Sequence, residues 1–157
     1  MAQYDLALAK LQRRKHDFGL TPRELHARKS LKGVIEEAGM QALIDLRGGW
    51  DDNQYALIGQ QLAEKLVDMA AMFGFESAHR LLRTAINAMR VYPTIDVEST
   101  LCAKTLLAIR FIISKQSEIA LLGAVRTAQV MYLAQIATMN PVAEDYLSDW
   151  LARANDC

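Results

Sequence analysis

The sequence predicts an all-α protein, and three features of the chain lead to this prediction. The stretch from Leu101 to Met139 runs 39 residues without proline, with one glycine and five charged residues. Proline and glycine number only 3 and 8 among 157 residues, which is too few for a loop-rich β fold. Apolar residues recur at helical spacing, and no stretch shows the alternation of a strand. We expect a single domain over residues 1–157, a bundle of six to seven helices around a long apolar helical hairpin at about 97–139.

The N-terminal third is expected to hold two helices. The first spans about residues 2–17 and ends in a cluster of cations, which suit the negative end of the helix dipole. Thr21-Pro22-Arg23-Glu24 is a capping box with proline at the first helical position, so a second helix starts there. This helix is expected to continue to about Leu46, and two glycines within it indicate a kink or a close helix contact.

The middle of the chain is expected to form a third and a fourth helix. Asp51 or Asp52 caps the third helix, which ends at Gly74 because glycine readily adopts the left-handed conformation that closes helices. The fourth helix spans about Glu76–Val91 and ends before Pro93.

The apolar segment is expected to divide near Ser114–Ser117 into helices at about 97–114 and 117–139. Asp96 or a neighbour caps the first of these helices, and Asn140-Pro141 ends the second and starts a last helix. Small residues recur along the second helix, at Ala120, Ala124, Thr127, Ala128 and Ala134. A face of this kind lets a neighbouring helix approach closely.

The net charge is zero, but the charges are segregated along the chain. Residues 10–32 hold eight Lys and Arg against two acids, and residues 36–76 hold eight acids against two basic residues. Two interpretations fit this pattern. Either the two regions face each other, within or between subunits, or the basic region binds a nucleic acid or an acidic protein partner.

The cysteines and the N-terminus indicate a cytoplasmic protein. Cys102 and Cys157 form no disulfide framework, and Cys102 is expected to be a buried apolar side chain. The N-terminus lacks the basic and apolar regions of a secretory signal. The best candidate for a membrane span, Ile119–Met139, contains Arg126, which costs about 2.5–3.5 kcal/mol at the centre of a bilayer. We therefore expect a core helix and no membrane partner.

Acidic residues on the second and third expected helices are the best indication of an enzyme. Glu36 and Glu37 lie on the second helix, and Glu64 and Asp68 lie one turn apart on the third. Carboxylates on facing helices can hold Mg²⁺, which prefers hard oxygen ligands and keeps waters for substrate phosphates. Over about residues 31–73, this arrangement resembles the all-α nucleotide pyrophosphatases of the MazG type.

The resemblance implies Mg²⁺-dependent nucleotide hydrolysis with these four carboxylates as the site, and Mg²⁺ is the only cofactor that any interpretation of the sequence requires. The chain departs from the family pattern at two positions. The family has Glu-x-x-Glu on the first helix, and here Met40 stands three residues after Glu37. The family has Glu-x-x-Asp on the second helix, and here Lys65 stands in place of the Glu.

The helix at 76–91 is the best indication of nucleic-acid binding. Arg80, Arg83, Asn87 and Arg90 are spaced so that they share one helix face. Arginine and asparagine read base edges and hold phosphates. The residues before this helix also have the Ala-x-x-x-Gly spacing of a helix-turn-helix, although Arg80 and Arg83 stand where that motif requires core hydrophobes.

No other motif predicts a cofactor or a metal. Glu76-Ser77-Ala78-His79 is the Glu-x-x-His unit of di-iron bundles, but the required second unit is absent from the sequence. A histidine-phosphotransfer pattern has Lys29 where the phosphoacceptor histidine is needed. The sequence contains no P-loop, dinucleotide-binding, nucleophile-elbow or zinc-protease motif.

The sequence therefore favours a non-enzymatic interaction or regulatory protein, with the basic helix faces as the partner surface. A homodimer is expected because the apolar segment is too apolar for one subunit to bury. The alternatives are a nucleic-acid-binding protein that uses the helix at 76–91, and a divergent Mg²⁺-dependent pyrophosphatase.

Overall fold

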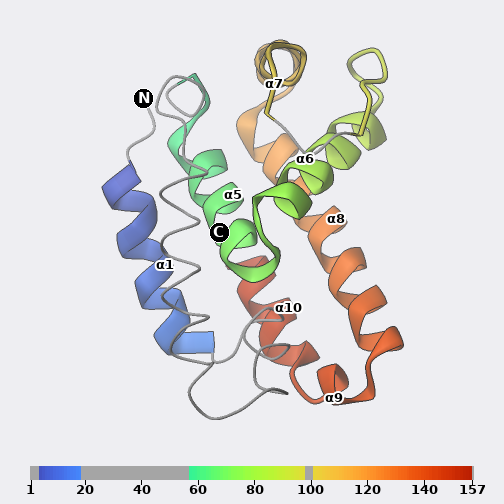
Figure 1. Cartoon of the computed structure of the whole chain (residues 1–157). Coiled ribbons are helices and arrows are strands. Elements are labelled where there is room, and N and C mark those ends of the chain that lie inside the picture. The colour runs from blue at the N-terminus through green and yellow to red at the C-terminus, as the bar shows by residue number, and fades with distance from the viewer. Residues whose placement is uncertain (1–3, 19–56, 98–100, 157) are drawn as a thin grey trace.

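The expected all-α class is confirmed. A computed structural model describes residues 4–18, 57–97 and 101–156, and none of these residues lies in a strand. The helices of the described residues are α1 (Tyr4–Phe18), α5 (Gln60–Phe73), α6 (Phe75–Met89), α7 (Ala103–Lys115), α8 (Glu118–Met139), α9 (Pro141–Glu144) and α10 (Leu147–Asn155), as Figure 1 shows. The expected helix at 21–46 and the turn before the third helix lie outside the described residues.

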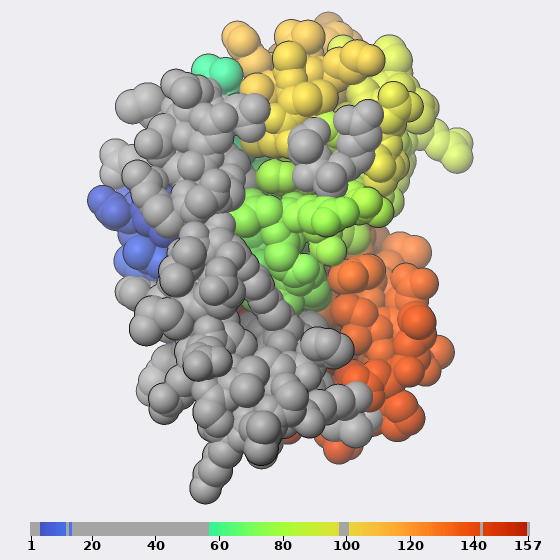
Figure 2. Space-filling model, viewed as in Figure 1, coloured from blue at the N-terminus to red at the C-terminus, as the bar shows by residue number. Residues whose placement is uncertain are grey.

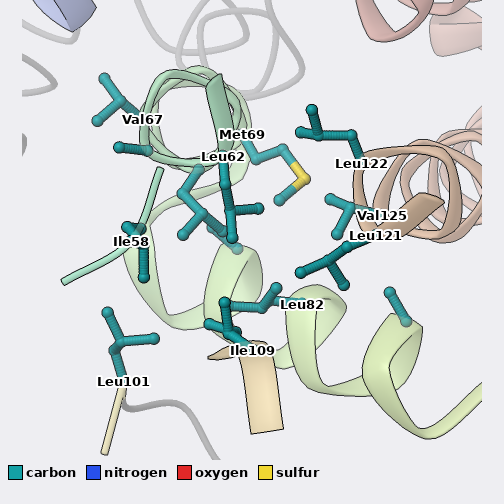
Figure 3. Close-up of a cluster of buried hydrophobic side chains, with 14 of the residues drawn as sticks. Ile58, Leu62, Val67, Met69, Leu82, Leu101, Ile109, Leu121, Leu122 and Val125 are labelled. Atoms are coloured by element: carbon teal, nitrogen blue, oxygen red, sulfur yellow. The ribbon is translucent and has the colours of Figure 1, made fainter. Parts of the chain in front are cut away.

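Helix α5 lies at the centre of the bundle, and most of its residues are buried. It packs beside α1 on one side and against α6 and α8 on the other (Figure 1). Figure 3 shows Leu62 and Met69 of α5 among Leu82 of α6, Ile109 of α7 and Val125 of α8. Burying one such side chain stabilises the fold by about 1.5–3 kcal/mol, so this cluster is the main source of stability.

The C-terminal helices close the other end of the bundle around a second apolar cluster. Trp150 of α10 is fully buried there with Met72 of α5 and Leu133 of α8. The last expected helix is in fact divided, because the chain turns between Glu144 and Leu147. This turn brings α10 back against α8 and α1.

The expected end of the third helix and the expected start of the helix after the break near Ser117 are both observed, and capping contacts hold them. Gly74 ends α5 with φ 91°, and its N–H donates to the Ala70 carbonyl at 2.7 Å. Ser117 caps α8, where its Oγ accepts a hydrogen bond from the Ala120 N–H at 3.0 Å. The expected break between the two helices of the apolar segment is therefore correct.

Two expected helix starts are wrong. Helix α5 begins at Gln60, after Gly59, and not near residue 52. A carboxylate from α8 explains this start, because Glu118 Oε1 accepts the Leu62 N–H at 3.2 Å. Helix α7 begins at Ala103, and the expected cap at Asp96 lies in a loop.

The long helix α8 is apolar around its circumference, but only one side of it is covered. Its most extensive packing is with α6 and not with α7, so the core is centred on α5, α6 and α8. Only 28% of its most apolar 18-residue stretch is buried. Leu121, Val125 and Leu133 point inward, whereas Met131 is 68% exposed. One subunit therefore leaves an apolar helix face in contact with solvent.

Candidate functional site

The two acids of α5 each meet a cation. Glu64 Oε2 lies 2.9 Å from Lys10 Nζ of α1, and its Oε1 accepts a hydrogen bond from Gln60 at 3.0 Å. One turn later, Asp68 Oδ1 accepts two hydrogen bonds from Arg153 of α10, at 3.0 and 2.8 Å. These two ion pairs tie α5 to α1 and to α10.

The Asp68–Arg153 pair is buried together with a second cation. Lys65 is 1% exposed, and its Nζ donates to the Ala154 carbonyl near the end of α10. A lysine at this place in the sequence is thus a structural link between α5 and α10. Cations at the C-terminal end of a helix also interact favourably with the helix dipole.

The structure describes half of the proposed Mg²⁺ ligand set. Glu36 and Glu37 lie outside the described residues, and the described residues contain no group of three or more His, Cys, Asp or Glu side chains that is placed to hold a metal. A Mg²⁺ ion at Glu64 and Asp68 would have to displace Lys10 from one and Arg153 from the other. The observed contacts of these two acids are structural ones.

Two of the four proposed nucleic-acid ligands on α6 hold the loop that follows the helix. Arg83 is 2% exposed and donates to the Asp96 carbonyl at 2.6 Å and to Cys102 Sγ at 3.3 Å. The Asn87 amide forms two hydrogen bonds with the Ile95 backbone, at 2.8 and 2.9 Å. These contacts explain why α7 begins later than the sequence suggests.

The other two proposed ligands are exposed. Arg80 forms an ion pair with Glu76 one turn earlier, at 2.8 Å. Arg90 ends α6 in the left-handed conformation, with φ 54°. The two side chains of the Glu-x-x-His unit do not point to a common metal position. Glu76 faces solvent, whereas His79 is buried against the Phe75 ring.

Cys102 occupies a polar site that the sequence did not suggest. It stands at the start of α7, where the Thr105 backbone N–H is the largest cause that lowers the pKa of its thiol. Burial acts in the opposite direction, and the Thr105 hydroxyl, the Lys104 N–H and the Arg83 charge lower the pKa further. A cavity of about 280 Å³ lined by Arg83, Cys102 and Lys104 opens beside the sulfur.

A partly uncovered apolar surface runs along α8. We call it the outer face of α8, and it consists of Ala120, Ala124, Thr127, Met131, Ala134 and Thr138. A groove of about 340 Å³ lies between this face and α6, where Thr84, Ala85, Ala88 and Met89 form its other wall. Figure 2 shows the orange atoms of α8 at the surface beside the green atoms of α6.

Helix α8 is also long and apolar enough to cross a membrane, judged by length and composition alone. Among the described residues, it is the one helix with this property.

Comparison of the chain with known protein families, with characterised proteins and with solved structures finds no match.

Two structural contacts were missed from the sequence for one reason: each joins residues far apart in the chain. Arg153 and Asp68 are 85 positions apart, and Glu118 and Leu62 are 56 positions apart. No local spacing indicates such pairs. The recurrence of small residues in the sequence indicated part of the outer face of α8.

Proposed function

We propose that this protein is a non-enzymatic interaction or regulatory protein that works as a homodimer through the outer face of α8. The observation that carries the proposal is the exposure of this face. A solvated helix face normally carries charged residues, and this one carries none. A closed two-fold association is the commonest way in which a protein covers such a face.

The exposed basic residues are then left for an acidic partner. Arg13 of α1 and Arg80 and Arg90 of α6 are exposed. Arg13 lies away from α8 in the chain, and Arg80 and Arg90 belong to α6 but do not line the groove beside the outer face of α8. Partner binding and self-association therefore use different residues.

The test is the mass of the full chain, measured by light scattering after size exclusion. We expect a dimer at high micromolar concentration and a monomer for Met131→Glu, because a buried carboxylate without a partner is costly. Arg110→Glu, on the exposed side of α7, is the matched control and should remain dimeric. A wild-type protein that is monomeric at all concentrations would contradict the proposal.

Nucleic-acid binding is the second candidate, and the exposure of Arg80 and Arg90 is the observation that favours it. With two phosphate contacts per subunit, the slope of log affinity against log salt would be about −1.8 per subunit. Binding that is absent at low salt, or unchanged in the Arg80→Ala/Arg90→Ala protein, would exclude this surface.

A further inference from the structure

Helix α7 has an exposed face that combines cations with large apolar side chains. We call it the basic face of α7, and its exposed residues are Lys104, Leu107, Arg110, Phe111, Ser114 and Lys115. Successive residues of a helix are about 100° apart, so these six cover an arc of about 140° with Leu107 in its middle. Arg110 lies at one edge of the arc, and Lys104 and Lys115 lie at the other. Figure 1 shows α7 at the end of the bundle opposite to α9 and α10.

The middle of this face is apolar and in part already held in place. Leu107 is 57% exposed and Phe111 is 38% exposed. The Phe111 ring meets the Tyr92 ring edge-on, with 5.5 Å between the centroids, and Lys115 Nζ lies 5.7 Å from the Phe111 centroid. A ring that is ordered before a partner arrives loses little conformational freedom on binding.

The contacts of the fold do not account for the cations of this face. Helix α7 contains no acidic residue, and neither Lys104 nor Arg110 forms an ion pair with a residue that the structure describes. On α6, by contrast, the exposed Arg80 is paired with Glu76 of the same helix. Lys104 also stands in the first turn of α7, where the helix dipole disfavours a cation. These cations can therefore meet an acid from outside the chain.

We propose that the basic face of α7 binds an acidic amphipathic helix of another protein. The apolar stripe of that helix packs on Leu107 and Phe111, and its carboxylates lie beside Lys104, Arg110 and Lys115. Charge complementarity identifies this occupant, because cations on both sides of an apolar centre match acids on both sides of an apolar stripe. The inference rests on the proposed interaction role, but not on the homodimer, since α7 contributes no residue to the outer face of α8.

Two other acidic partners fit the face less well. An anionic membrane attracts cations, but a stable contact also needs apolar side chains that enter the lipid. The Phe111 ring is instead held against Tyr92, and Asp96, which lines one cavity together with Lys104, would be repelled by anionic headgroups. A nucleic acid supplies phosphates to the cations, but its phosphate backbone gives Leu107 no apolar contact.

Peptide binding to the full chain tests the charges. The probe is a fluorescent helical peptide of about 20 residues, with a leucine stripe flanked by glutamates, and binding is followed by anisotropy at low salt. We expect the Lys104→Glu/Arg110→Glu protein to bind at least about tenfold more weakly than the wild type, because like charges then face each other. Arg13→Glu/Arg80→Glu changes the net charge equally at exposed positions on α1 and α6 and should bind as the wild type does.

A second variant tests the apolar centre. Leu107→Gln is expected to weaken binding about fivefold, because part of the apolar contact is lost. Since Leu107 is exposed, this protein should fold as the wild type does, and its circular dichroism spectrum checks this. A peptide with alanine in place of each leucine should lose binding to the wild type in the same way.

The outcomes separate the inference from the proposed function. Losses confined to the two α7 variants support the inference, and an equal loss in Arg13→Glu/Arg80→Glu overturns it. No peptide binding overturns it and leaves the homodimer in place, whereas a monomeric wild type that binds the peptide overturns only the homodimer. A Lys104→Glu/Arg110→Glu protein that is monomeric where the wild type is dimeric overturns it in favour of a second copy. Binding to phosphatidylserine vesicles without peptide binding overturns it in favour of a membrane.

Discussion

At the scale of single residues, the described part of the chain uses buried charge to join distant segments. Lys65, Asp68, Arg83 and Arg153 are each at most 2% exposed. Lys65 and Asp68 connect α5 to α10, and Arg83 connects α6 to the loop before α7. Burying an ion costs several kcal/mol before its partner is counted, so each of these residues stabilises the fold only while its contacts are intact.

Asp68→Ala is expected to destabilise the protein by about 3–5 kcal/mol, because it leaves the Arg153 guanidinium buried without its carboxylate. Urea denaturation followed by circular dichroism measures the loss. Glu76→Ala removes the carboxylate from an exposed pair and should cost under about 1 kcal/mol. Equal losses in the two variants would contradict the structural role of Asp68.

Cys102 is expected to alkylate as a thiolate at a lower pH than an ordinary thiol. The hydrogen bond from the Thr105 N–H lowers its pKa, and the Arg83 charge adds to this. Since the folded pKa lies below the unfolded one, the thiolate stabilises the fold above the unfolded pKa, and this contribution is lost as the pH falls through the folded pKa. The rate of reaction with iodoacetamide against pH, in a Cys157→Ser protein, measures the midpoint. If the rate of alkylation has the pH midpoint of a free cysteine, the hydrogen bond between the Cys102 thiol and the Thr105 N–H of α7 is contradicted. Thr105→Val should move the midpoint toward that value.

At the scale of the elements, helix boundaries depend on contacts between helices as well as on local signals. Helix α5 begins at Gln60 because the carboxylate of Glu118, from the first turn of α8, accepts the Leu62 N–H. Gly59 leaves the space for this carboxylate, since a Cβ at Gly59 would lie 2.1 Å from Glu118 Oε1. The start of one helix is thus fixed by the first turn of another.

Gly59→Ala is expected to destabilise the protein by about 1 kcal/mol, because the added methyl group displaces the carboxylate that caps α5. The backbone of Gly59 has φ −66°, which alanine adopts without strain. The cost is therefore expected to fall in a Glu118→Ala background, where the methyl group has nothing to displace. A double-mutant cycle by urea denaturation should give a coupling of about 0.5–1.5 kcal/mol. Additive losses would contradict the proposed contact.

The elements also show which parts of the structure could be predicted from the sequence. Gly74 and Ser117 act within one turn of the chain, and both ends were predicted correctly. The starts of α5 and α7 could not be predicted, because Glu118 and Arg83 act across 56 and 13 positions. Spacing on α6 likewise predicted a shared face for Arg83 and Asn87, but not the loop that both of them hold.

At the scale of the whole molecule, the inner and outer sides of α8 have different roles. The inner side packs on α5, α6 and α10 and completes the core. The outer face adds less to the stability of the monomer, since Thr127, Met131, Ala134 and Thr138 are exposed. If that face pairs with a second copy, association and folding are linked, and the stability of the protein depends on its concentration.

The thermal unfolding midpoint is therefore expected to rise with protein concentration. A partner at 100 times its dissociation constant stabilises a folded subunit by about 2.7 kcal/mol. For a chain of this length, each kcal/mol raises the Tm by about 2–4 °C, so the Tm should rise by about 5–10 °C between concentrations well below and 100-fold above the dissociation constant. Scanning fluorimetry across this range measures the change. Met131→Glu should have the Tm of the dilute wild type at every concentration, because the charge blocks pairing and leaves the monomer intact. A wild-type Tm that does not change over the range would show that the outer face of α8 makes no contact with a second copy.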